Sequence, residues 1–179
     1  MMPIGPLMIE HRLIERMIAL MAGKVRKMKE NRSADTEFIL TAVDFIKTYA
    51  DKLHHGKEEN ILFRDLKKKP LSAAHNKMID DFVSEHNIAR GHTKAIADSL
   101  DRHIKGGKGP ITEIISNIEF LVSFYPVHIE KEDRHFFIPV MEYFSKEEQA
   151  SMLNEFTEFD RKFIHNRYDD KVSGLERRG

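Results

Sequence analysis

The chain has 179 residues, 41% hydrophobic and 32% charged, and its 29 Lys and Arg residues balance its 29 Asp and Glu residues. This composition is ordinary for a single globular domain, and the balanced charge gives no indication of a nucleic-acid or anionic-membrane partner, since both favour a basic surface. The absence of cysteine excludes disulfides, thiolate metal sites and cysteine catalysis. Because we see neither a signal-peptide pattern nor an apolar run near the ~18 residues of a membrane span, we expect a cytoplasmic protein.

The spacing of apolar residues predicts an all-α protein. Apolar side chains recur every three or four positions, as on amphipathic helices, and no segment has the alternation of a strand. We expect four long helices at about 3–29, 35–68, 72–104 and 110–143, a shorter fifth at about 146–168, a single domain over 1–170 and a frayed tail over 171–179.

Polar residues mark the predicted helix boundaries. Ser33 or Asp35 can cap the second helix, Ser72 can cap the third, and Ser145 with Glu148 resembles a capping box at the start of the fifth. Gly56 lies inside the second helix, where glycine costs ~1 kcal/mol relative to alanine. We interpret it as making room beside His54.

Four helices of similar length joined by short loops predict an up-down-up-down antiparallel four-helix bundle, with the fifth helix packed alongside. At ~1.5 Å rise per residue and with alternating helix directions, one inward-facing histidine from each long helix falls at a similar height. These histidines are His11, His54, His86 and His128. Glu58 and Glu132 follow His54 and His128 by four residues, so each lies on the same helix face as its histidine.

Six ionisable groups in one layer of a helical core predict a metal site. Each group would cost several kcal/mol if it were buried without a partner. Imidazoles and carboxylates together suit iron, manganese or zinc. Two divalent ions bridged by Glu58 and Glu132 would use all six groups.

The ordered motifs Glu10-His11, His54-x3-Glu58-Glu59, Glu85-His86 and His128-x3-Glu132-Asp133 cover the predicted bundle. Together they resemble hemerythrin and the hemerythrin-like (HHE cation-binding) domains, over about residues 4–143. The resemblance implies a non-haem di-iron centre inside a four-helix bundle, with a role in O2 binding, in sensing or in iron handling. It further implies that His11 and His54 bind one iron, that His86 and His128 bind the other, and that Glu58 and Glu132 bridge them.

One departure from hemerythrin affects the predicted ligand set. Hemerythrin has a further histidine four residues before the one on the third helix, and Phe82 stands there in this chain. One metal is then a ligand short, and we expect His135, one turn beyond Glu132, to supply the missing ligand. The alternatives are Glu85, Glu15, His165 or water.

Other polar groups near the predicted layer have less defined roles. Hemerythrin also places an Asp five residues after the fourth-helix histidine, whereas Glu132 follows His128 at four, as in many HHE domains. We expect His55 and Glu59 to be surface or supporting groups, because each lies about 100° around the helix from its neighbour. A register shifted by one residue would instead make them the ligand pair. Tyr125 faces the core near the site, where we expect it to pack rather than to hydrogen-bond a bound oxygen species.

We therefore predict a hemerythrin-like iron protein that binds or senses O2 or a related small diatomic molecule, or handles iron, rather than an enzyme. A ferritin-like di-iron oxidase is an alternative, but it would show Glu-x-x-His on two helices, and only Glu132 to His135 fits. A mononuclear or zinc-binding helical bundle is another, and zinc or manganese could replace iron.

Overall fold

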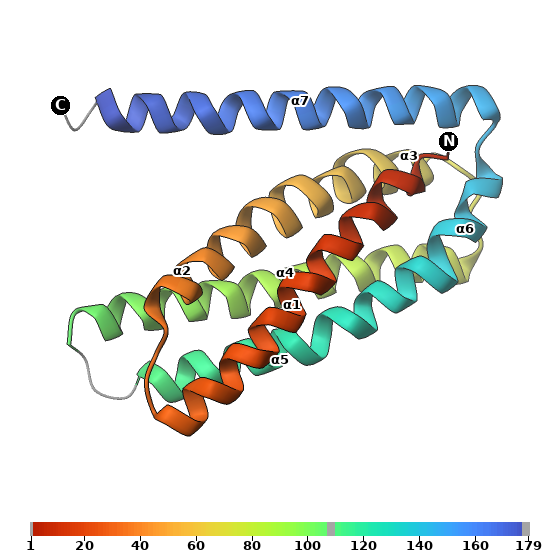
Figure 1. Ribbon diagram of the computed structural model, residues 1–179. Helices are drawn as coiled ribbons and strands as arrows, with labels where there is room; N and C mark the ends of the chain where they lie inside the picture. The colour runs from red at the N-terminus through yellow and green to blue at the C-terminus, as the bar shows by residue number, and fades with distance from the viewer. Residues whose placement is uncertain (1, 107–109, 177–179) are drawn as a thin grey trace.

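The structure, a computed structural model, describes residues 2–106 and 110–176, and within them the side chains of all residues except 110 and 165–176. Every regular element in these ranges is helical (Figure 1). The elements are α1 (Ile4–Asn31), α2 (Thr36–Phe45), η1 (Ile46–His55), η2 (Glu58–Phe63), α3 (Arg64–Leu66), α4 (Ala73–Ile104), α5 (Pro110–Lys131), η3 (Glu132–Phe136), α6 (Phe137–Val140), η4 (Met141–Tyr143) and α7 (Lys146–Glu176).

The long helices lie side by side, and α7 runs along their outside (Figure 1). Helix α4 packs against α5, α5 packs against α1, and α2 and η1 pack against α4, while α7 contacts η1 and η2. The elements from α2 to α3 together form the predicted second helix, and those from α5 to η4 form the predicted fourth. Helix α7 ends later than predicted, at Glu176 instead of about 168. Within the described chain, no helix combines the length and apolarity needed to cross a bilayer.

The predicted capping groups form the expected hydrogen bonds. The Asp35 carboxylate accepts a hydrogen bond from the Phe38 N–H at 3.1 Å, and the Ser72 hydroxyl accepts one from the His75 N–H at 3.1 Å. At the start of α7 the Glu148 N–H donates to the Ser145 hydroxyl at 3.2 Å, and the Ser145 N–H donates to the Glu148 carboxylate at 2.9 Å. These bonds satisfy amide groups that the first turn of a helix leaves free.

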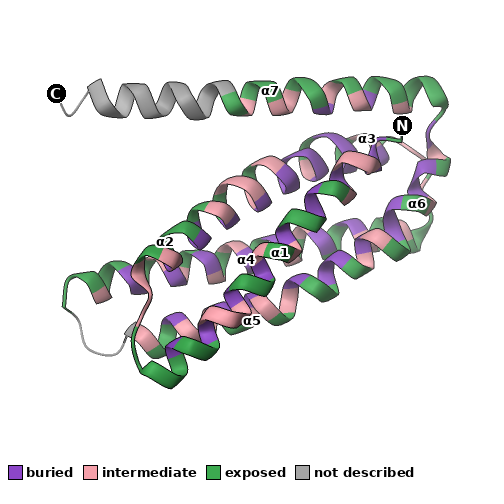
Figure 2. Ribbon diagram, viewed as in Figure 1, coloured by how far each residue is buried: buried purple, intermediate pink, exposed green. Residues whose placement is uncertain are grey.

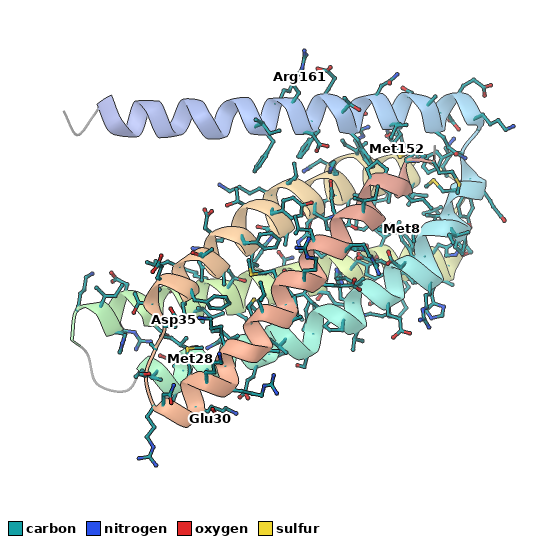
Figure 3. The ribbon with its side chains drawn as sticks, in the orientation of Figure 1. Met8, Met28, Glu30, Asp35, Met152 and Arg161 are labelled. Atoms are coloured by element: carbon teal, nitrogen blue, oxygen red, sulfur yellow. The ribbon has the colours of Figure 1, made fainter. Side chains whose placement is uncertain are left out.

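The core consists of two apolar clusters with a polar layer between them. On α1, Leu7 belongs to one cluster and Ile14 to the other, with His11 between them. On α4, Phe82 and Ala89 flank His86 in the same way. Figure 2 shows the buried positions following the inward faces of the helices, and Figure 3 labels Met8 and Met28 at the two ends of α1. The apolar clusters on both sides keep water away from the layer.

Three stretches are π-helical: η1, η2 and η3. A π-helix closes i→i+5 hydrogen bonds, so its turn holds more residues than an α-turn and successive side chains diverge less around the axis. This geometry corrects two sequence predictions. His55, expected at the surface or in a supporting role, is only 1% exposed, like its neighbour His54. His135, expected to face the layer, is exposed, because η3 shifts the register and turns the buried Phe136 inward instead.

Candidate metal centre

The polar layer contains two groups of side chains that could each hold a metal ion. His11, His54, Glu58 and Glu132 form one group, and their ligand atoms all lie within 4.8 Å of one another. We call it the two-histidine cluster. His55, His86 and His128 form the second group by the same criterion, which we call the three-histidine cluster. All seven side chains are buried.

The two glutamates connect the clusters. Glu58 directs Oε1 toward His54 Nε2 and Oε2 toward His86 Nε2, each at 3.4 Å. Glu132 Oε2 lies 3.2 Å from His11 Nε2 and 3.4 Å from His128 Nε2. Each carboxylate therefore faces imidazoles of both clusters, which is the placement that a bridging ligand needs.

The atoms that face the middle of the layer lack hydrogen-bond partners. They are Nε2 of His11, His54, His86 and His128, together with both carboxylate oxygens of Glu58 and of Glu132. Buried polar atoms are almost always satisfied, and leaving so many without partners would be costly. Cations would be bound by all of these lone pairs at once, so the donor set fits a pair of metal ions.

Outside the layer, a carboxylate holds the other ring nitrogen of each of these four histidines. The distances from Nδ1 to the carboxylate oxygen are 2.8 Å for His11 and Asp133, 2.9 Å for His54 and Glu10, 2.7 Å for His86 and Glu59, and 2.8 Å for His128 and Glu85. A carboxylate on one ring nitrogen fixes the orientation and tautomer of a metal-binding histidine and leaves the other nitrogen for the metal.

Each orienting carboxylate also contacts a cation. The pairs are Glu10 with Lys57, Glu59 with Arg90, Glu85 with Lys131, and Asp133 with Arg12. Lys57 is completely buried, whereas the Lys131 side chain is 38% exposed. These cations hold the carboxylates in position behind the imidazoles.

The protonation states of the two glutamates differ in the absence of metal. Burial and the neighbouring Glu132 raise the pKa of Glu58 well above its ordinary value. Burial alone would raise the pKa of Glu132 as well, but His128 and His11 beside it hold that pKa well below its ordinary value. Two carboxylates this close do not both ionise readily, so without metal Glu58 is the more easily protonated of the two glutamates.

The histidines of the layer also differ. Burial alone would lower the pKa of His11, but its hydrogen bond to Asp133 and the adjacent carboxylate of Glu132 raise it to about 9. Burial and neighbouring imidazoles lower the pKa values of His54 and His55 well below the usual range. Metal ions take up the neutral form of histidine, and His54 and His55 are already in that form.

The structure brings six of the seven predicted site residues into the layer: His11, His54, Glu58, His86, His128 and Glu132. It does not bring in His135, which is exposed. Of the alternatives for the missing ligand, Glu15 pairs with Arg12 at 3.0 Å, Glu85 binds Nδ1 of His128 from outside, and the His165 side chain lies outside the described residues.

His55 occupies the place for which a ligand was missing. It completes the three-histidine cluster from η1, and its ring stacks on the ring of His86 at 3.8 Å between centroids. Phe82 instead packs edge-on against His128 at 5.6 Å. The adjacent histidines His54 and His55 indicated this ligand in the sequence. Because the segment was interpreted as an α-helix, His55 was predicted to point away from the core.

The comparison with protein families agrees with this geometry. The model of the hemerythrin HHE cation-binding domain matches residues 2–138. The chain belongs to this family. The match covers the ligand layer and ends before α7, so α7 is an addition to the part that the family model describes. No curated protein and no solved structure gave a significant match.

Proposed function

We propose that this HHE-family chain binds two iron ions in its buried layer and that this centre binds or senses O2 or a related diatomic molecule. The proposal includes an up-down-up-down antiparallel arrangement of the four long helices, which the packing of α4 on α5 and of α5 on α1 supports. The observation that carries the proposal is the set of unpartnered ring nitrogens and carboxylate oxygens facing one another between two apolar clusters.

The chain offers different ligand sets to the two ions. The ion nearer His11 and His54 would have two imidazoles, and the ion nearer His86 and His128 would also have His55. Glu58 and Glu132 face both positions. The position with fewer protein ligands would leave room for an exogenous molecule, and iron bound there would supply the redox chemistry of O2.

The surrounding residues position and shield the centre. The carboxylates of Glu10, Glu59, Glu85 and Asp133 hold the imidazoles in place. The ring of Phe137 stacks on that of His11 at 5.6 Å, beside the two-histidine cluster. An apolar wall there limits the access of water to the centre.

Elemental analysis tests the proposal, both on the protein as purified and on the protein after aerobic reconstitution with iron. We expect two irons per chain in the unmodified protein and clear losses in His54→Ala and His128→Ala. Lys29→Ala, in an exposed ion pair with Glu119, is a surface control that should keep the full metal content. Unchanged iron content in both histidine variants would contradict the proposed metal centre. Two bound irons without any optical change on exposure to O2 would contradict O2 as the bound molecule.

The ferritin-like alternative receives less support. It depended on Glu132 and His135 acting together, and His135 is exposed while Glu132 is buried. Zinc or manganese in place of iron would appear directly in the elemental analysis.

A further inference from the structure

A pocket of about 280 Å³ opens beside the three-histidine cluster, between η1, α4 and α5. His55 and Tyr125 form part of its lining, together with Ile46, Ala89 and the exposed Lys47 and Lys52. Neither His11 nor His54 lines it, so a molecule in this pocket would meet the metal centre only through His55. Its volume is slightly below the range of drug-sized ligand sites, which points to a small organic molecule.

Two buried polar groups of this pocket have no hydrogen-bond partner. One is the hydroxyl of Tyr125, a residue that is only 1% exposed. The other is Nδ1 of His55, which lies 3.4 Å from Oδ1 of Asp51 without forming a hydrogen bond. Burial raises the pKa of Tyr125, so its hydroxyl stays protonated and can donate a hydrogen bond. A buried hydroxyl without a partner is costly, and a ligand atom with a lone pair would remove that cost.

The charges around the pocket favour an anion. Lys47 and Lys52 place two exposed cations at the edge of the pocket, and the charge of Lys47 also acts on Asp98. The acidic side chain of the lining, Asp51, is already engaged by Arg90, whose Nε donates to it at 2.7 Å. Exposed cations at the edge of a pocket raise the local concentration of small anions.

The rest of the lining is mostly apolar. Ile46 and Ala89 are each 2% exposed. The hydroxyl of Thr93 already donates a hydrogen bond to the backbone carbonyl of Ala89 at 2.8 Å. We propose that this pocket binds a small organic acid of a few carbon atoms, whose carboxylate accepts a hydrogen bond from Tyr125 and whose aliphatic part packs on Ile46 and Ala89. Lys47 and Lys52 attract the acid but do not reach its buried end. The site does not depend on which metal occupies the layer.

Titration of the full chain with butyrate, and with the uncharged butyramide, tests this proposal by calorimetry. We expect saturable binding of butyrate that weakens with increasing salt and clearly weaker binding of butyramide. Tyr125→Phe should weaken butyrate binding on the order of 10- to 100-fold, since the bond to a charged acceptor is lost. Tyr49→Phe is the matched control, because Tyr49 lies on the same helix segment as His55 but does not line the pocket. It should bind butyrate as the unmodified protein does.

Two further measurements test the role of the two lysines and the position of the bound carboxylate. The exposed pair Lys47→Gln and Lys52→Gln should weaken butyrate binding and remove its salt dependence without affecting folding. A crystal structure with butyrate should place the carboxylate at the Tyr125 hydroxyl. Equal binding of butyrate and butyramide, unchanged binding in Tyr125→Phe, or butyrate found on the metal ions would each overturn the proposal. Metal content is measured in a separate experiment. A protein that binds no iron would therefore contradict the di-iron centre but not the proposed acid-binding pocket.

Discussion

The ammonium group of Lys57 lies 2.8 Å from the Asp160 carboxylate of α7 and also pairs with Glu10 of α1. Glu10 in turn accepts a hydrogen bond from Nδ1 of His54, so a continuous series of contacts runs from α7 to the ligand layer. The equivalent lysine in the other half, Lys131, pairs with Glu85 but is partly exposed. Helix α7 is therefore connected to the centre on the His54 side.

Replacing Lys57 by methionine should destabilise the protein far more than the same change at Lys131. Lys57→Met leaves the buried Glu10 without its counter-charge, and breaking a buried pair from one side costs about 3–5 kcal/mol. Lys131→Met removes a cation that water can partly replace, at a cost of about 0–1 kcal/mol. Urea unfolding of both variants gives the two free energies of unfolding, and equal values would show that burial of Lys57 has no energetic consequence.

Gly56 should respond to alanine in opposite directions depending on Phe159. A Cβ at position 56 would lie 2.8 Å from Cζ of Phe159 on α7, too close for an ordinary contact. We expect Gly56→Ala alone to destabilise the protein by displacing that ring. In a Phe159→Ala background the contact is gone, and Gly56→Ala should stabilise by ~1 kcal/mol through helix propensity. A double-mutant cycle measures both effects, and additive changes would contradict the contact.

His55 and His135 give opposite expectations for metal content. His55→Ala removes one imidazole of the three-histidine cluster, so we expect the loss of about one metal equivalent or a much weaker second site. His135→Ala changes an exposed side chain and should leave metal content unchanged. Elemental analysis distinguishes the two, with circular dichroism to confirm folding. Metal loss in His135→Ala alone would restore the ligand assignment made from the sequence.

Metal affinity should rise with pH. Metal binding requires a neutral His11, whose pKa is raised to about 9 by Asp133 and Glu132 despite burial. Below that pH the metal must displace a proton, so from about pH 8.5 to about pH 6.5 each unit should weaken apparent affinity roughly 10-fold. Competition with a chromophoric chelator measures this slope, which should be smaller in His11→Ala.

The stability of the metal-free protein should depend on pH in the opposite sense. The pKa of His11 is higher in the folded chain than its value of about 6.5 in the unfolded chain. The contribution of His11 to the free energy of unfolding is therefore fully present below about pH 6.5. It is lost as the pH rises through about 9. The melting temperature of chelator-treated protein should fall over this interval, less so in His11→Ala. A melting temperature that rose equally in both proteins would contradict the assigned proton.

Periodicity alone was sufficient to predict the helices. Inward stripes such as Ile39, Val43 and Ile46 are buried as expected, and Asp35 and Ser72 cap their helices. The place where α7 ends differed from the prediction because its polar sequence carries a weaker apolar stripe. Gly56 was correctly singled out, but the space it leaves is used by Phe159 and not by His54.

Much of the ligand layer was also accessible from spacing, since His54 and Glu58 remain on one face in either kind of helix. The π-helical turns could not be predicted in this way, because the sequence was interpreted with α-helical geometry. For this reason His55 was predicted to point away from the layer and His135 to point into it. Glu59, expected as a surface or supporting group, does support His86. The orienting roles of Glu10, Glu85 and Asp133 were missed for another reason. Glu10 serves a histidine of another helix, and contacts between helices cannot be obtained from the spacing within one.

The segment from His54 to Glu59 and the segment from His128 to Asp133 are built on one plan, but His55 of the first corresponds to the buried Ile129 of the second. A single imidazole thus makes two otherwise equivalent binding positions unequal. We expect ions to enter in sequence, with the position near His86 filled first and emptied last. When iron is scarce, a half-loaded form would then accumulate, with its vacancy on the side that α7 covers.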